Sequence, residues 1–273
     1  MEHGYVHVEK KGHGPAVVLL HGWGQNLYMM KFLQDHLQNQ FTVFNLDLPG
    51  FGKSEEPLYC WSVDEYAQFL YCLLEEEGVK NPILIAHSFG ARIAICYAAR
   101  YPCKKLILTG AAGLLPKRGI TYYLKVSMYK LCKKLSINLT MGSEDYQKAS
   151  SVMRGVLVKA VNENLESLLP RIRCDTLLVW GEKDEQTPLW IGEKNGAAAS
   201  PCITYCFQKR RTLCLFFIKA FVFKELLMHF WREKYEYHTV DILSLIFLLV
   251  PIKQFAAYVS TKIAIDLIVT VHG

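Results

Sequence analysis

Short runs of consecutive apolar residues recur along the first two thirds of the chain, separated by segments with helical spacing. An alternating segment, Tyr5–Glu9, precedes them and is expected to be the first strand. The runs have the pattern of strands buried on both faces. They are Ala16–Leu20, Phe41–Leu46, Pro82–Ala86, Lys105–Thr109 and Thr176–Trp180. Because alternating strands and helices form parallel sheets covered by helices, the pattern predicts an α/β fold with a mainly parallel sheet.

The intervening segments carry signals for helix ends as well as helical spacing. A helix is expected near Met29–Gln38. Another begins after Ser62, because Glu65 stands three residues on and completes a capping box, and it stops at Gly78. Small and apolar residues over Ala91–Tyr101 predict a third helix.

The strand–helix alternation breaks at about Leu114, and this break suggests the domain organisation. Residues 115–168 are rich in Lys, Tyr, Leu and Met at helical spacing, and we interpret them as a helical cap inserted into the core. The core is then residues 1–114 and 169–193. Residues 194–273 form a C-terminal tail of different composition, with ten Lys or Arg against five Asp or Glu.

The chemistry centres on Ser88, which lies between a predicted strand and a predicted helix. Residues Ala86-His87-Ser88-Phe89-Gly90 fit the strand–turn–helix context of the G-x-S-x-G nucleophile motif, with Ala86 in place of the first glycine. Such a turn exposes the serine hydroxyl above a helix N-terminus, where negative charge is favoured. The alternative is an ordinary turn that happens to contain Ser and Gly.

Four segments in order resemble the α/β-hydrolase fold family, in particular its capped serine hydrolases and esterases. They are Val17–Gly24, Asp47–Ser54, Ala86–Ala91 and Leu178–Asp184, so the resemblance covers about residues 3–193. It implies hydrolysis of a carboxylic ester or similar acyl bond of a small molecule, without metal or organic cofactor. Serine at position 88 argues against the epoxide hydrolases and haloalkane dehalogenases of this family, which carry aspartate there.

The resemblance also implies roles for residues around Ser88. The backbone N–H groups of Trp23 and Phe89 would form the oxyanion hole. Asp184, in the loop after the Thr176–Trp180 run, would orient the catalytic histidine. Glu182 and Glu185 are alternatives for this acid, and the loop could also be a solvated acidic turn.

The histidine of the family is missing from its expected place, some 25 residues after the acid. No histidine occurs between His87 and His229. One interpretation is a divergent tail that supplies its own base. His229 would be the best candidate, ahead of His238 and His272, although a histidine without a catalytic role is the commoner case for each.

The second interpretation is a shifted reading frame after Lys194. With permitted codons, a one-base shift there gives the peptide KMAQQLPHALLIVFKKGGHFAYF, which contains an apolar strand and then Gly-Gly-His. Its histidine codon straddles Thr212 and Leu213. Residues 195–273 would then not have been selected as part of this fold.

Composition indicates the cellular compartment of the protein and excludes some classes of partner. The nine cysteines show no paired zinc spacing, which favours a reduced, cytoplasmic protein. The net charge of +6 arises mostly in the tail, so it does not indicate a nucleic-acid-binding surface. The polar start, Met1–Lys11, is not expected to be a signal peptide, and the longest apolar run, Ile242–Ile252, is too short to span a bilayer.

Three functions therefore remain open from the sequence. The first is a serine esterase, and the second is a carbon–carbon bond hydrolase that acts on diketones with the same triad. The third is a catalytically inert pseudo-hydrolase or defective product that lacks its base.

Overall fold

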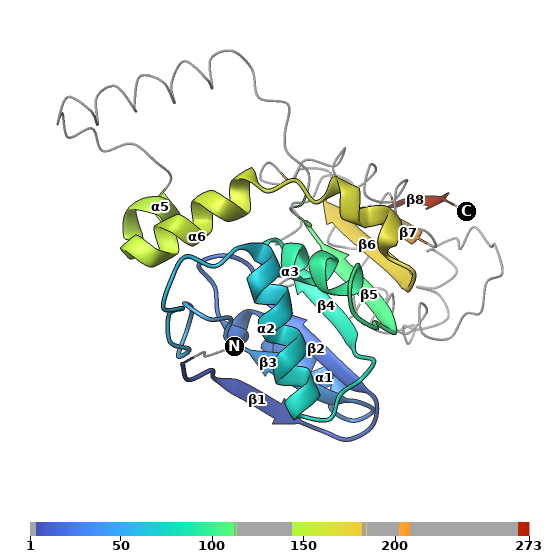
Figure 1. Ribbon diagram of the computed structural model, residues 1–273. Helices are drawn as coiled ribbons and strands as arrows, with labels where there is room; N and C mark the ends of the chain where they lie inside the picture. The colour runs from blue at the N-terminus through green and yellow to red at the C-terminus, as the bar shows by residue number, and fades with distance from the viewer. Residues whose placement is uncertain are drawn as a thin grey trace, which may run out of the picture.

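The computed structural model describes residues 4–111, 113, 144–181, 184, 202–207 and 267–272. Within them a single eight-stranded sheet runs through the molecule, with helices on its faces (Figure 1). The strands are β1 (Val8–Lys11), β2 (Ala16–Leu20), β3 (Thr42–Leu46), β4 (Ile83–His87), β5 (Lys105–Thr109), β6 (Asp175–Gly181), β7 (Cys202–Phe207) and β8 (Leu267–His272). Their spatial order is β1-β3-β2-β4-β5-β6-β7-β8.

The sheet is parallel from β3 to β7 and antiparallel at both edges, where β1 pairs with β3 and β8 pairs with β7. This confirms the mainly parallel α/β fold expected from the sequence. The strand at the amino-terminal edge is Val8–Lys11 and not Tyr5–Glu9. The backbone of Tyr5 is instead bonded to Glu55, through its N–H to Oε2 and its carbonyl to the Glu55 N–H, both at 2.9 Å.

The central strands are buried on both faces, as their continuous apolar runs predict. One face packs under α2 (Val63–Glu76) and α3 (Phe89–Ala98), where a cluster includes Val18, Leu84 and Leu106. The other face packs against η1 (Leu27–Met30) and α1 (Lys31–Leu37). Alternate residues of each strand therefore enter different halves of the core.

The ends of α2 are those that the sequence predicts. The Ser62 hydroxyl accepts the Glu65 N–H at 3.2 Å, and the Glu65 carboxylate accepts the Ser62 N–H at 2.6 Å, so the capping box is formed. Gly78 follows the helix with a φ of +73°, which is the left-handed conformation of a helix stop.

Three helical segments lie among the described residues between β5 and β6. They are α5 (Glu144–Lys148), α6 (Ser151–Asn162) and η2 (Glu166–Arg171), and α6 lies above α2 in the view of Figure 1. The Arg92 guanidinium of α3 donates to the Glu163 carbonyl at the end of α6, at 3.1 Å. Residues 115–143 of the predicted cap lie outside the described residues, so the division into core, cap and tail stays a prediction.

The tail contributes two strands that were not predicted from the sequence. β7 extends the parallel sheet beyond β6, with Thr176 paired to Cys202 and Gly181 to Phe207. β8 pairs with β7 in the antiparallel sense and is the last strand at this edge of the sheet. No helix among the described residues is both long and apolar enough to cross a membrane.

Candidate active site

The strand order places the predicted nucleophile at the point where the chain reverses its direction of winding. From β2 the chain moves to β3 on one side, whereas β4 and the strands after it lie on the other. The loops after β2 and β4 therefore begin side by side at the carboxyl ends of these strands and then lead in opposite directions. In open α/β sheets, ligands bind in the crevice at such a switch point.

Ser88 follows β4 in a backbone conformation that L-residues rarely adopt. It has a φ of +48° and is the one non-glycine residue with positive φ among those described. Its N–H donates to the Thr109 carbonyl at the end of β5 at 3.1 Å, and it is the N-cap residue of α3. A strained serine at a strand-to-helix turn, held by the neighbouring strand, is the geometry of a nucleophile elbow.

Gly90 allows the elbow to touch the loop after β2. Its N–H donates to the His21 carbonyl at 3.1 Å. A Cβ at position 90 would lie 2.6 Å from the carbonyl oxygens of both Leu20 and His21, so only glycine fits without a backbone shift. This contact joins the helix after Ser88 to the loop that carries Trp23.

His21 fixes the shape of that loop. Its Nδ1 lies 2.8 Å from the Gly22 carbonyl, and its Nε2 accepts the Leu48 N–H at 3.0 Å. An acceptor at Nε2 and a donor at Nδ1 require neutral imidazole. Burial agrees, because it lowers the pKa of His21 to about 4. The His21 side chain is therefore structural.

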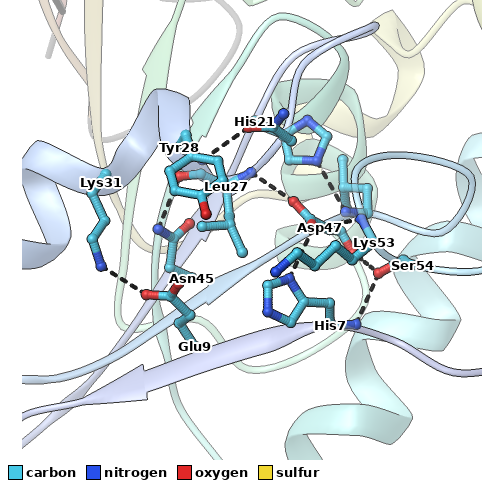
Figure 2. Close-up of polar contacts among 12 residues, drawn as sticks. His7, Glu9, His21, Leu27, Tyr28, Lys31, Asn45, Asp47, Lys53 and Ser54 are labelled. Atoms are coloured by element: carbon cyan, nitrogen blue, oxygen red, sulfur yellow. Dashed lines mark hydrogen bonds and ion pairs between the residues drawn. The ribbon is translucent and has the colours of Figure 1, made fainter.

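Asp47, which follows β3, forms hydrogen bonds that hold the loops next to His21 in place (Figure 2). Its carboxylate accepts the N–H groups of Leu27 and Lys53 at 2.7 and 2.8 Å and contacts the His7 ring at 2.9 Å. These hydrogen bonds lower the pKa of Asp47 against the opposing effect of burial. With all these partners, Asp47 is a structural carboxylate that holds the turn after β3.

Aromatic side chains form a wall beside the elbow that was not singled out in the sequence. The rings of Trp23 and Phe89 pack edge to face at 5.2 Å, and Phe51 contacts Trp23 at 4.9 Å. Tyr66 of α2 packs on Phe89 at 5.3 Å and donates its hydroxyl to the Pro49 carbonyl. The Asp47–Ser54 motif therefore places Phe51 in this aromatic wall. The glycine-rich turn of the motif is the sequence signal that could have indicated it.

His87 immediately precedes Ser88 and is tied to β5. Its Nδ1 lies 3.0 Å from both the carbonyl and the hydroxyl oxygen of Thr109. Burial lowers the pKa of His87 to about 4, while the nearby charge of Asp184 acts in the opposite direction. Asp184, half-buried after β6, thus lies close enough to the elbow for its charge to be felt there.

The structure brings Ser88, Trp23, Phe89 and Asp184 to the same end of the sheet. Phe89, as the first residue of α3, has a backbone N–H without an acceptor in its own helix. His229, His238, Glu182 and Glu185 lie outside the described residues.

His272 is placed at the other end of the sheet. It pairs with Cys202, which in turn pairs with Thr176 near the start of β6. Ser88 instead follows His87, which pairs with Thr109 at the end of β5. The strand register therefore separates His272 from the nucleophile and leaves it unsuited to act as the base. Among the residues that the structure describes, no group of three or more His, Cys, Asp or Glu side chains forms a metal site.

Residues 15–122 match the family model of the alpha/beta hydrolase fold. The chain is 36% identical over 217 residues to the pimeloyl-[acyl-carrier protein] methyl ester esterase of Vibrio vulnificus, covering 69% of this chain and 83% of that protein. It is 27% identical over 221 residues to the AB hydrolase superfamily protein YisY of Bacillus subtilis, covering 68% and 81%.

Other similarities are more limited in extent or in identity. The match to an uncharacterized protein of Mycobacterium tuberculosis spans 37% of that protein. Among solved structures, an esterase from Exiguobacterium antarcticum superposes with a TM-score of 0.64 at 24% identity, covering 84% of this chain and 96% of that chain. At this identity the superposition supports the arrangement of strands and helices alone.

Proposed function

Because the chain belongs to the α/β-hydrolase fold family, we propose that it acts as a serine hydrolase on a carboxylic ester or similar acyl substrate, with Ser88 as nucleophile. The observation that carries the proposal is the strained elbow at Ser88, joined by Gly90 to the loop of Trp23. The sequence similarity to a methyl ester esterase supports the ester class.

Each residue of the proposed site has one task. The Ser88 hydroxyl attacks the acyl carbon and gives its proton to a histidine, which passes the proton to the leaving alcohol. The N–H groups of Trp23 and Phe89 bind the oxyanion that develops, a contribution of about 3–4 kcal/mol for a single donor. Asp184 orients the histidine and stabilises its protonated form. Water, activated by the same histidine, then releases the acid.

His229 is the candidate base in this chain as it stands. A restored reading frame would instead supply a histidine at about position 212. Both sources lead to the same role for Ser88 and Asp184, but only the first gives this chain its own base, so hydrolysis by the unmodified chain tests that case.

Ester hydrolysis by paired variants tests the proposal. We expect the unmodified chain to hydrolyse short-chain aryl esters, and Ser88→Ala and Asp184→Asn to lower kcat/KM by a factor on the order of 10³ or more. Asp35→Asn, an exposed carboxylate on α1, is the matched control and should change nothing. A dienoate-type diketone assayed in parallel distinguishes carbon–carbon bond hydrolysis.

Two outcomes would overturn the proposal. Unchanged ester hydrolysis by Ser88→Ala would show that this serine is not the nucleophile. A folded but inactive chain would favour the inert pseudo-hydrolase.

A further inference from the structure

Two cysteines from segments far apart in sequence lie together at the end of the sheet opposite Ser88. Cys103 stands two residues before β5, and Cys174 stands immediately before β6. These strands are parallel neighbours, with Lys105 paired to Asp175 at their first residues. Neighbouring strands are about 4.8 Å apart, so the two backbones approach within the range that a disulfide can bridge.

Several contacts hold both cysteines in this arrangement. The Cys103 thiol donates to the Lys105 carbonyl at 3.3 Å, and the Thr176 hydroxyl donates to the Cys174 carbonyl at 3.1 Å. The Lys105 ammonium and the Asp175 carboxylate form an ion pair at 3.1 Å between the two strands. Both side chains pack against the same hydrophobic cluster under α2 and α3, and neither is in a disulfide.

The chemistry of the pair differs between its members. The neighbouring Cys103 thiol lowers the pKa of the Cys174 thiol, so Cys174 is the thiol that ionises first. Both side chains are half-buried and not sealed in the core. A small oxidant can therefore reach them, whereas Cys96 and Cys202 are buried.

We propose that Cys103 and Cys174 form a redox-active thiol pair that closes to an intramolecular disulfide in the presence of a low-molecular-weight disulfide. The Cys174 thiolate attacks one sulfur of the oxidant, forming a mixed disulfide and releasing one thiolate. The Cys103 thiol then loses its proton and attacks the Cys174 sulfur, expelling the second thiolate. The protein gives up two electrons and two protons, and the oxidant leaves as two thiols.

The disulfide would tie together the starts of β5 and β6. It would enclose residues 104–173, which include α5, α6 and the predicted cap. Closing so long a loop restricts the unfolded chain, so the oxidised protein should unfold at a higher temperature than the reduced protein. The pair is independent of the proposed hydrolase chemistry because it lies at the other end of the sheet.

Oxidation with glutathione disulfide followed by peptide mapping tests this inference directly. After alkylation of free thiols, trypsin should release Tyr101–Lys104 joined to Cys174–Lys183, and dithiothreitol should separate them. The mapping uses the unmodified chain, so it does not depend on how a variant folds. In Cys103→Ser and Cys174→Ser the linked peptide should be absent, whereas the matched control Cys72→Ser should retain it.

The contrary results are equally specific. The inference is wrong if both peptides are recovered fully alkylated after oxidation, or if Cys174 stops at a stable mixed disulfide with glutathione. It is also wrong if the dominant disulfide joins either cysteine to another one. An oxidised protein that carries the linked peptide but melts at the temperature of the reduced form would overturn the stabilising role.

Discussion

Gly90 and Ser88 sit two residues apart but constrain the elbow in different ways. Ser88 keeps its side chain and accepts a strained backbone, with a φ of +48°. Gly90 has no such φ, and glycine is needed there because two carbonyl oxygens would lie 2.6 Å from any Cβ. Backbone atoms in a parallel sheet cannot move aside as the end of a flexible side chain can.

Replacing Gly90 with alanine should therefore destabilise the fold by about 1–3 kcal/mol, the usual cost of overpacking a tight interior. The free energy of unfolding in urea measures it. Gly113→Ala is the matched control, because its Cβ would meet the end of the Ile95 side chain at 3.3 Å. Equal losses in the two variants would mean that the close approach at Gly90 is not what requires glycine.

Because two histidines are buried, we expect the free energy of unfolding to fall as the pH is lowered. Burial lowers the pKa of His21 and of His87 to about 4, below the value of about 6.5 in an unfolded chain. The unfolded state therefore binds more protons between these values. Stability should be fully present above about pH 6.5 and should fall as the pH drops toward 4, by up to about 3 kcal/mol for one histidine.

Urea unfolding at several pH values between 7 and 4 checks this dependence. His21→Gln should flatten the slope, whereas His36→Gln, at an exposed position on α1, should leave it unchanged. A slope of the opposite sign, or one that His21→Gln does not alter, would contradict the burial of neutral imidazole.

At the scale of the element, α2 shows how far local sequence signals determine a helix. Ser62, Glu65 and Gly78 predicted its two ends, and the capping box is formed. The ends of α3 were predicted less well. It begins at Phe89 and not at Ala91, because the strained turn at Ser88 starts the helix at once. It ends at Ala98 and not at Tyr101, where Pro102 disfavours helical conformation in the residue before it.

Removing the cap of α2 should cost about 1 kcal/mol. Ser62→Ala leaves the Glu65 N–H without its acceptor, whereas Ser62→Asp provides another oxygen at the same place. Thermal unfolding should show a lower Tm for the alanine variant and a nearly unchanged Tm for the aspartate variant. Equal Tm values for alanine and the unmodified chain would show that the box adds no stability.

At the scale of the whole molecule, the sequence predicted the central sheet and most of the candidate site. The continuous apolar runs identified β2 to β6, because strands buried on both faces need apolar residues throughout. The position of Ser88, the Trp23 loop and Asp184 followed from motifs at the ends of those strands. Strand order did not follow, because the pairing of β2 with β4 depends on contacts far apart along the chain.

The tail was the least predictable part. β7 was missed because Cys202–Phe207 mixes Cys, Thr and Tyr with single apolar residues. It occupies the same six positions as Ala-Leu-Leu-Ile-Val-Phe in the shifted-frame peptide, so a strand there is compatible with both interpretations of the tail. The nucleotide sequence across codons 190–215 separates them, since a shifted frame requires a one-base change that restores Gly-Gly-His.

Labelling by a fluorophosphonate is the most direct test of Ser88 as the nucleophile, because the reagent bonds covalently to activated serines. In a folded sample, mass spectrometry should find the adduct on the tryptic peptide Asn81–Arg92, at Ser88, and Ser88→Ala should abolish it. Asp184→Asn should slow the reaction, whereas the control Asp35→Asn should not. Absence of the adduct from a folded chain, or its appearance on another serine, would contradict the proposed hydrolase mechanism.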